Sequence, residues 1–206
     1  MVDHNVLRLV AITDDIRDGQ SGLVARAARA VSGGATCVQL RLKDVSARDL
    51  VGVARELVSS LAVPVIVNDR ADVAIASGAA GVHLGADDVP ASAIRSIAPA
   101  GFIIGVSVGC DDEVASAAGA DYVGIGPVFE TISKRDAGKA IGLTAFARLA
   151  VATGLPSVAI GGISVTNAHS AIEAGADGVA TISAVFGGKT IDPGAAATAL
   201  RRAIES

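Results

Sequence analysis

The sequence predicts an α/β protein, because short apolar runs alternate with helix-like segments along its whole length. Hydrophobic residues make up 51% of the 206 residues but aromatic residues only 2%, so Val, Ile, Leu and Ala must build the core. Such a core is typical of parallel sheets and of the helices that cover them. Strand–helix units in a chain this short close most economically into one (β/α)8 TIM barrel domain over residues 1–206, with an open doubly wound sheet as the alternative.

Eight apolar runs are the expected strands, and a helical window follows each of them, the last within residues 194–205. The runs occupy residues 7–13, 37–42, 63–69, 81–85, 102–108, 122–126, 157–162 and 178–183. A weak repeat supports this count, because Gly-Ala or Gly-Gly-Ala stands just before every second strand, in segments 32–40, 77–85, 118–126 and 174–182. Glycine there fits a helix end, and a recurrence of about 40 to 55 residues equals two strand–helix units.

Composition and local patterns argue against several classes of function. No apolar run approaches the roughly 20 residues that span a bilayer, and the N-terminus lacks a signal-like pattern, so we expect a cytoplasmic protein with no membrane partner. A net charge of −4 without a basic block argues against a nucleic-acid partner. Cys37 and Cys110 have no CxxC or CxxH neighbour, so we expect buried free thiols rather than a zinc site or a disulfide. The oligomeric state stays open, a homo-oligomer included.

Polar side chains gather where the expected strands end. They are Gln39, Arg41, Lys43, Asn68, Asp69, Asp87, Asp88, Ser107 and Ser183, and the glycines Gly161 and Gly162 end another strand on the same face. Barrel enzymes build their sites on the face formed by the C-terminal ends of the strands. The clustering therefore predicts a functional site on that face.

The stretch VQLRLK places polar and apolar side chains on opposite sides of a strand. If the apolar set packs against helices, then Gln39, Arg41 and Lys43 point into the barrel mouth. Two cations and an amide would suit a phosphorylated ligand with a polar ring. The alternative is that Arg41 and Lys43 pair with nearby acids such as Asp44.

Asp69 and Asp88 end neighbouring strands and are hard oxygen ligands, so together they could hold Mg²⁺ while phosphate oxygens and water complete its shell. The alternative is structural, because Asp is common at helix N-termini and Asp88 closely precedes Val89-Pro90. Asn68 could orient the same phosphate or tie down a turn.

Two further segments suit an anion. The Gly-Gly at 161–162 and residues 181–183 follow the last two strands, where barrels commonly bind a phosphate with backbone N–H groups. The long connection 126–143 carries hydroxyls and cations and is expected to act as a lid, with a solvated loop as the alternative.

His83 alternates with apolar neighbours, so we expect it inside the barrel as a hydrogen-bonded core histidine rather than a base. No Cys-His or Ser-His-Asp arrangement can be placed together, so hydrolysis through a nucleophile has little support.

Seven ordered blocks, QLRLK, VNDR, GVHLGADD, IGVS, GADYVGIGPVFETISK, AIGGI and GADGVATIS, resemble the thiamine phosphate synthase family over nearly the whole chain. The resemblance implies a TIM barrel of thiamine biosynthesis, a transferase that uses Mg²⁺. It would join 4-amino-2-methyl-5-(diphosphooxymethyl)pyrimidine to 4-methyl-5-(2-phosphooxyethyl)thiazole, or its carboxylated form, and release diphosphate. Its mechanism is dissociative, since diphosphate leaves before the thiazole nitrogen attacks.

The resemblance also assigns roles by position. The segment that holds the pyrimidine diphosphate would comprise Gln39, Leu40, Arg41, Leu42 and Lys43, with Asn68, Ser107 and Lys134 as further contacts. The Mg²⁺ ligands would be Asp69 and Asp88. The thiazole phosphate would meet Thr131, Ile132, Ser133, Gly162, Ile182 and Ser183. The catalytic set would be Arg41, Lys43, Lys134 and Ser107, whose cations oppose the charge of the leaving group while no nucleophile is required.

The chain departs from the family pattern at three positions, and two rival functions are considered. Ala86 stands where the family often has Gln, and Ser133 replaces a usual Thr but keeps the hydroxyl. The related thiazole tautomerases use a His base where this chain has Gly109, which favours the synthase over the tautomerase. A non-catalytic paralogue that binds thiazole phosphate is a third alternative, opposed by the complete set of catalytic positions.

Overall fold

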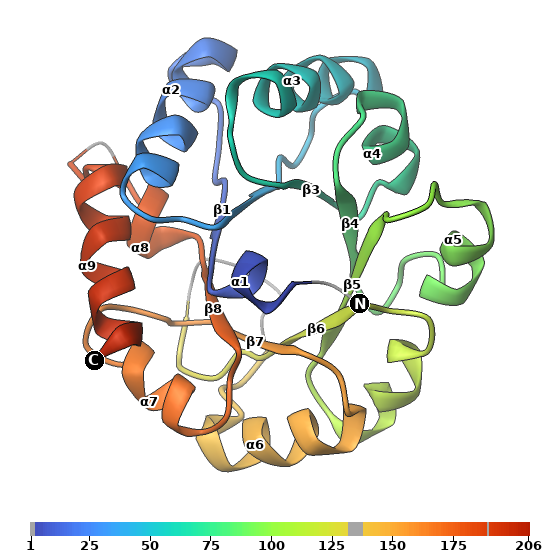
Figure 1. The fold of residues 1–206 in the computed structure, drawn as a ribbon, viewed down its shortest axis with the longest axis vertical. Coiled ribbons are helices and arrows are strands. Elements are labelled where there is room, and N and C mark those ends of the chain that lie inside the picture. Colours follow the sequence, from blue (N-terminus) through green and yellow to red (C-terminus); the bar gives the residue numbers. More distant parts are fainter. Residues whose placement is uncertain (1–2, 132–137, 189) are drawn as a thin grey trace.

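Eight parallel strands form a closed barrel in a computed structural model that describes residues 3–131, 138–188 and 190–206. The strands are β1 (Leu9–Ile12), β2 (Cys37–Leu40), β3 (Val65–Asn68), β4 (Gly81–Leu84), β5 (Ile103–Val108), β6 (Tyr122–Ile125), β7 (Ser157–Ile160) and β8 (Gly178–Thr181). Each strand pairs with the next in sequence, and β8 pairs with β1 to close the ring (Figure 1). The predicted TIM barrel is confirmed, and the open doubly wound sheet is not formed.

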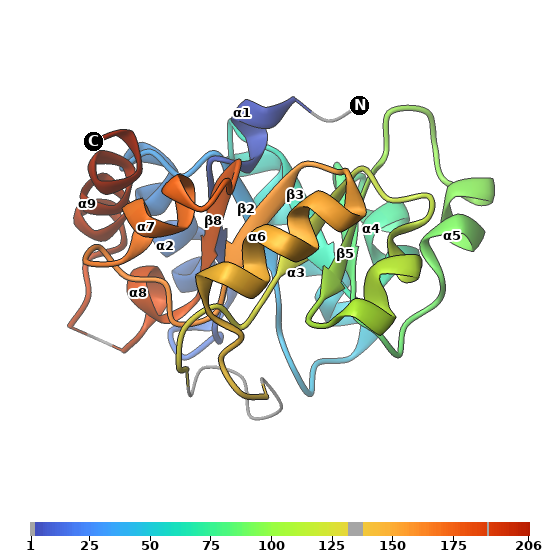
Figure 2. The same ribbon diagram turned by 90° about the horizontal axis from the view of Figure 1, so that it is seen from below.

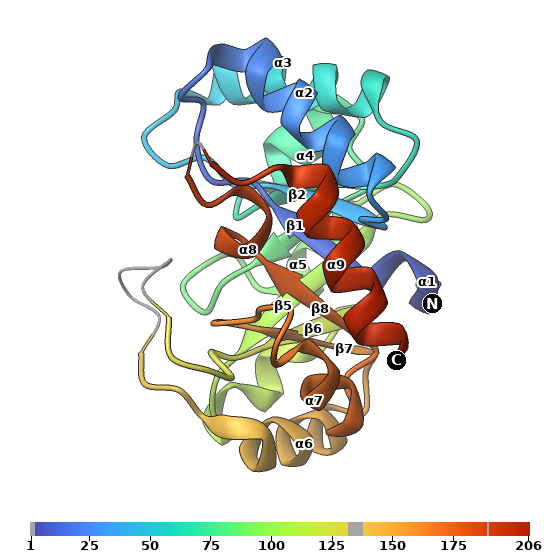
Figure 3. The same cartoon turned by 90° about the vertical axis from the view of Figure 1, so that its left-hand side faces the viewer.

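Helices surround this ring (Figure 3). They are α2 (Gly19–Ser32), α3 (Ala47–Ser60), α4 (Ala71–Ser77), α5 (Ala91–Ile97), α6 (Gly142–Thr153), α7 (Ala168–Glu173) and α9 (Pro193–Glu205). After β5 the connection is a 3-10 helix, η1 (Asp111–Ala117), instead of an α-helix. Its one buried residue is Ala117, so it lacks the continuous apolar face by which the longer helices pack against the strands. A short extra helix, α8 (Ser183–Phe186), comes between β8 and α9.

The two ends of the barrel have different roles. The N-terminal helix α1 (His4–Leu7) lies across one opening, with Leu7 fully buried (Figures 1 and 2). The C-terminal ends of the strands open at the other end (Figure 2). Among the described residues, the chain therefore covers one end of the barrel itself, and the face that carries the clustered polar residues is left open.

The Gly-Ala repeat has a structural cause. The four glycines that precede the even-numbered strands all have positive φ, namely Gly34 (109°), Gly78 (74°), Gly119 (89°) and Gly175 (97°). In the last two repeats the following aspartates also fix a neighbouring strand, because Asp121 accepts a hydrogen bond from Ile104 N (2.8 Å) and Asp177 from Ser157 N (2.7 Å). The glycine of each repeat thus adopts the left-handed conformation typical of a helix end, and the two aspartates tie the coming strand to the strand before it.

The core has two layers. Aliphatic side chains fill the space between the strands and the helices, and a smaller inner cluster, including Val10, Ile12, Ile66 and Val158, fills the barrel itself. Each fully buried aliphatic side chain contributes about 1.5–3 kcal/mol. The inner cluster forms a solid base below the open face, so a ligand can enter only at the C-terminal ends of the strands.

One expectation about the cysteines is wrong. Cys37 lies inside the barrel, where burial raises its pKa to about 12, as expected for an inert thiol. Cys110 is exposed, because it follows β5 on the open rim rather than lying within a strand. Among the helices of the described residues, none combines the length and the apolar character needed to cross a membrane.

Candidate active site

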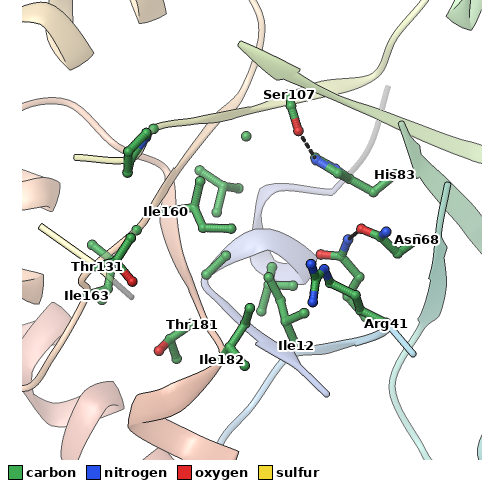
Figure 4. Close-up of a pocket in the computed structure, with 18 of the residues that line it drawn as sticks. Ile12, Arg41, Asn68, His83, Ser107, Thr131, Ile160, Ile163, Thr181 and Ile182 are labelled. Carbon is green, nitrogen blue, oxygen red and sulfur yellow. Dashed lines mark hydrogen bonds between the residues drawn. The ribbon is translucent and has the colours of Figure 1, made fainter. Parts of the chain in front are cut away.

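Two adjoining cavities open at the C-terminal ends of the strands. The first, of about 150 Å³, has mostly aliphatic walls that include Ile12, Val158, Ile160 and Ile163, and we call it the apolar compartment (Figure 4). The second, of about 700 Å³, is lined by charged side chains that include Lys43, Asp69, Asp88 and Lys139, and we call it the charged compartment. Their shared wall contains Arg41, Asn68, His83, Ser107, Gly126 and Pro127.

The end of β2 brings predicted residues together. Gln39 is only 4% exposed, and its Nε2 donates a hydrogen bond of 2.9 Å to Oδ1 of Asn68 at the end of β3. Arg41 and Lys43 lie just beyond the strand, because β2 ends at Leu40 rather than at residue 42. The predicted orientation of Gln39, Arg41 and Lys43 toward the barrel mouth is confirmed, since all three line the cavities.

Thr13, which the sequence did not single out, extends the pairing of β1 and β2 by one step. Its fully buried hydroxyl accepts a hydrogen bond from Arg41 N (2.9 Å) and donates one to Arg41 O (3.2 Å). Both backbone groups of Arg41 are therefore fixed beyond the end of the strand. The role of Thr13 could have been inferred from the sequence, because a Thr at the end of an apolar run has a hydroxyl that needs a hydrogen-bond partner when buried.

Within the described part of the chain, Arg41 and Lys43 have no acidic partner at ion-pair distance. Among the described residues, the ion pairs involve other arginines, such as Arg26 and Arg70, and neither Arg41 nor Lys43 pairs with Asp44. Both cations line the charged compartment, where they partly offset the raised pKa of Asp69. The alternative of a local pair with Asp44 is not formed.

Leu40 and Leu42 point away from the cavities. Leu40 is 1% exposed within the layer between strands and helices, and Leu42 packs against the same layer. This follows from the alternation of side chains along a strand. A contact of these two residues with a ligand would have to come from their backbone.

Asp69 and Asp88 meet in the charged compartment. Burial, followed by the charge and hydrogen bonding of Asp88, raises the pKa of Asp69, while Lys43 and Arg41 oppose that rise. Asp69 also has a φ of 64°, a left-handed conformation that costs a non-glycine residue on the order of 1 kcal/mol. The fold therefore holds two carboxyl groups together against both electrostatic repulsion and backbone preference.

Asp88 also has the structural role that was the alternative. Its Oδ2 accepts a hydrogen bond of 2.7 Å from Gly85 N and so fixes the turn after β4. The described residues contain no group of three or more His, Cys, Asp or Glu side chains arranged to hold a metal. Two adjacent carboxylates nevertheless fit a hard divalent cation whose remaining ligands are phosphate oxygens and water.

His83 is a hydrogen-bonded histidine inside the barrel, as predicted, and is 8% exposed. Its Nδ1 lies 2.9 Å from the Tyr122 hydroxyl, and its Nε2 lies 3.0 Å from the Ser107 hydroxyl (Figure 4). Ser107 lines both compartments. Sequence reasoning placed Ser107 in the site but missed Tyr122, since a single aromatic at the start of a strand gives no functional signal.

The glycine loop after β7 approaches the apolar compartment with its backbone. Gly162 has a φ of 66°, and a Cβ there would lie 2.5 Å from Glu130 O. Asn167, also missed from the sequence, holds this loop, because its Nδ2 donates to Gly162 O (2.9 Å) and its Oδ1 accepts from Ser164 N (2.8 Å). The loop is therefore preformed, with room for a ligand but not for side chains.

The loop after β8 is tied to the loop after β1. Ile182 and Ser183 line the apolar compartment at the start of α8. Arg17 donates a hydrogen bond of 2.5 Å to Phe186 O at the end of α8 and pairs with Asp14. This contact was not predicted, because it joins residues 169 positions apart.

The long connection after β6 is only partly described. Thr131 lines the apolar compartment, and Lys139 lies exposed at the edge of the charged one. The predicted contacts Ile132, Ser133 and Lys134 lie outside the described residues. Gly109 lines the charged compartment, where its N–H donates to Oε2 of Glu113 (2.5 Å).

Comparison with known proteins agrees with this geometry. A family model described as thiamine monophosphate synthase matches residues 9–185. The chain is 52% identical over 163 residues to the thiamine-phosphate synthase of Methanoculleus marisnigri, covering 77% of each chain. It is 48% identical over 200 residues to the thiamine-phosphate synthase of a Roseiflexus species, covering 95% of this chain and 84% of that one.

Solved structures give the same result. The thiamine phosphate pyrophosphorylase from Pyrococcus furiosus superposes with a TM-score of 0.86 at 38% identity, covering 98% of this chain and 97% of the other. A 3-hexulose-6-phosphate synthase has a TM-score of 0.73 at 19% identity, which is a likeness of fold alone. The family match spans most of the chain, so the protein belongs to the thiamine monophosphate synthase family.

Proposed function

We propose that the protein is a thiamine-phosphate synthase that joins a pyrimidine methyl diphosphate to a thiazole phosphate and releases diphosphate. The observation that carries this proposal is the pair of adjoining compartments, one charged and one apolar, with a common wall at Arg41 and Ser107. Two substrates of different charge could meet across such a wall. The relatives named above support the same activity.

The charged compartment suits the diphosphate. Arg41 and Lys43 supply positive charge, and Asn68 and Ser107 supply hydrogen-bonding groups on the shared wall. Asp69 and Asp88 would hold Mg²⁺, which would neutralise the diphosphate and so favour its departure. Lys134 is expected to add a further cation from the long connection.

The apolar compartment suits the thiazole ring and its phosphate. Aliphatic side chains such as Ile160 would contact the ring, while Gly162 and Ser183 would bind the phosphate through their backbone N–H groups. Thr131 lines this compartment, and we propose it as a contact to the thiazole phosphate together with Ile132 and Ser133, which lie outside the described residues. This arrangement would leave the thiazole nitrogen facing the shared wall.

The reaction needs electrostatic stabilisation and positioning rather than a protein nucleophile. The bond between the pyrimidine methylene carbon and the diphosphate oxygen breaks, and diphosphate leaves with the electron pair. The thiazole nitrogen then donates its lone pair to the methylene cation. Arg41, Lys43 and the Ser107 hydroxyl would stabilise the departing charge, and the two compartments would hold the reacting atoms close together.

The tautomerase alternative lacks a base where it would need one. Gly109 contributes only backbone to the charged compartment, and its amide is occupied by Glu113. A non-catalytic binding protein would not need cations and paired carboxylates on the diphosphate side. The geometry therefore favours the synthase over both.

The direct test is an assay of the purified protein with both substrates. We expect stoichiometric thiamine phosphate and diphosphate in the presence of Mg²⁺, and loss of both products when the metal is chelated. Isomerisation of the thiazole without diphosphate release would support the tautomerase instead. Tight binding of thiazole phosphate without turnover would support the regulatory alternative.

A further inference from the structure

Three side chains from three strands form a hydrogen-bonded row that runs from the barrel interior to the wall between the compartments. Tyr122 on β6 contacts His83 on β4, and His83 contacts Ser107 on β5 (Figure 4 shows the second contact). We propose that Tyr122 fixes the tautomer of His83 and thereby makes the Ser107 hydroxyl a hydrogen-bond donor toward bound substrate. Tyr122 and His83 are positioning residues in this arrangement, and the identity of the substrate rests on the proposed function.

The direction of the first hydrogen bond follows from the chemistry of its two groups. A phenol is a good donor and a poor acceptor, whereas an unprotonated imidazole nitrogen is a good acceptor. Tyr122 is 2% exposed, and in the described part of the chain its hydroxyl has one hydrogen-bond partner, Nδ1 of His83 at 2.9 Å. The phenol therefore donates to Nδ1, because the reverse arrangement leaves a buried O–H without an acceptor.

The hydroxyl of Tyr122 stays protonated. Burial raises the pKa of Tyr122 well above its ordinary value. The neighbouring Cys37 also keeps its proton, since burial raises the pKa of its thiol to about 12. The phenol is therefore protonated and acts as a hydrogen-bond donor.

The direction of the second hydrogen bond follows from the first. With the lone pair of Nδ1 occupied, a neutral His83 carries its proton on Nε2 and donates it to the Ser107 oxygen, 3.0 Å away. Ser107 has then accepted one hydrogen bond, and its own O–H is free to turn toward the two compartments that it lines. In the opposite direction, the Ser107 hydroxyl would donate its proton to Nε2 of His83. Only the lone pairs of the Ser107 oxygen would then face the anionic substrate, and they would repel it.

Two glycines leave the space that the rings of Tyr122 and His83 occupy. Gly105 pairs with Tyr122 in the register of β5 and β6, and a Cβ on Gly105 would lie 2.2 Å from Cζ of Tyr122. A Cβ on Gly124 would lie 3.0 Å from Cε1 of His83. The backbone therefore makes room for both rings, which a side chain at either glycine would displace.

The tautomer can be measured by NMR on protein labelled with ¹⁵N-histidine, without substrate. We expect a protonated Nε2 and an unprotonated Nδ1 for His83 in the wild type, and loss of this single tautomer in Tyr122→Phe. The other two histidines, the exposed His4 and the half-buried His169, are assigned with His4→Gln and His169→Gln, so that their signals are told apart from those of His83. A proton on Nδ1, or on both nitrogens, in the wild type would overturn the proposal.

Kinetics provide the second readout. We expect Tyr122→Phe to lower kcat about tenfold, because Ser107 would no longer be fixed as a hydrogen-bond donor to the anionic substrate, with little change in the KM for the thiazole phosphate. Gly105→Ala should cause a similar loss, since it displaces the ring without removing a polar group. Ser77→Ala is the matched control, because it removes a buried hydroxyl in α4 that donates only to Ala74 O. An unchanged kcat in Tyr122→Phe would count against the proposal.

A double-mutant cycle separates this row from a general loss of stability. Because both side chains act through one hydroxyl, Ser107→Ala with Tyr122→Phe should be no slower than Ser107→Ala alone. Additive losses would contradict the proposal. The NMR result does not depend on turnover, so a protein that makes no thiamine phosphate but shows the expected tautomer would overturn the proposed function and leave the row intact.

Discussion

The two halves of the open face use different means to prepare for a ligand. The loops after β2, β3 and β4 present side-chain charges, with Arg41 and Lys43 near the carboxyl groups of Asp69 and Asp88. The loops after β7 and β8 present backbone and aliphatic surface, held by Asn167 and Arg17 from behind. The first half would therefore recognise a ligand by its charge and the second by its shape, although the loops of both halves follow parallel strands of one barrel.

The difference extends to stability. The charged half holds Asp69 in a left-handed conformation with a raised pKa, so it keeps unfavourable energy that a bound cation could relieve. The half with the glycine loop uses positive φ at Gly161 and Gly162, where no such penalty arises. Substitutions should therefore affect activity and stability differently in the two halves, and four of them test this.

The largest effect is expected for Asp88→Asn. The amide oxygen can still accept the hydrogen bond from Gly85 N, but the charge that would hold Mg²⁺ is lost. We expect kcat/KM to fall about 100-fold at limiting Mg²⁺, as is typical when a metal ligand or its support is removed. Asp87→Asn, which removes the same charge one residue away, should cost far less. Equal losses in titrations of activity against Mg²⁺ would show a general field effect rather than a ligand.

The next effect is expected for Gly162→Ala in the other half. Its Cβ would lie 2.5 Å from Glu130 O, so the loop must move, and we expect the KM for the thiazole phosphate to rise about tenfold, equivalent to about 1.4 kcal/mol. The KM for the pyrimidine diphosphate should change little. Gly154→Ala is matched in conformation, since Gly154 has a φ of 63° with open space around it. A similar change in both KM values would mean that the two halves are not independent.

A smaller effect is expected for Thr13→Val, which keeps the shape of the side chain but removes the hydroxyl that fixes Arg41. We expect kcat/KM for the pyrimidine diphosphate to fall about fivefold, since a net hydrogen bond contributes about 1 kcal/mol. Thr13→Ser should restore activity because it restores the hydroxyl. Failure of the serine variant to recover would indicate that packing, not hydrogen bonding, positions Arg41.

The smallest effect is a gain of stability in Asp69→Asn. Because the pKa of Asp69 is raised in the folded protein, the protonated carboxyl group stabilises the fold. This stabilisation is complete below the ordinary pKa of an aspartate and is lost as pH rises through the raised pKa of the folded state. Near pH 7 with the metal chelated, the variant should melt about 1 °C higher, because solvent screens much of the repulsion. The advantage should vanish under acid conditions. Mg²⁺ should raise the melting temperature of the wild type but not of the variant; an unstabilised wild type would argue against the ion site.

Much of the fold was predictable because its signals are local. The alternation in VQLRLK placed Gln39 inside the barrel and Leu40 outside it, and this is confirmed. The Gly-Ala repeats marked the positions of positive φ before the even strands. Local rules failed where the chain leaves a strand, since β2 ends at Leu40 and the thiol of Cys110 is exposed on the rim.

The sequence by itself determined the number of strands, their order and the polar face, because side-chain periodicity and glycine conformations depend only on neighbouring residues. Only the tertiary structure decided which side chains meet across the strands. Thr13 reaches Arg41, Tyr122 reaches His83, and Arg17 reaches Phe186 across separations of 28, 39 and 169 residues. Such contacts depend on the register and closure of the barrel, and no single segment of the sequence contains that information.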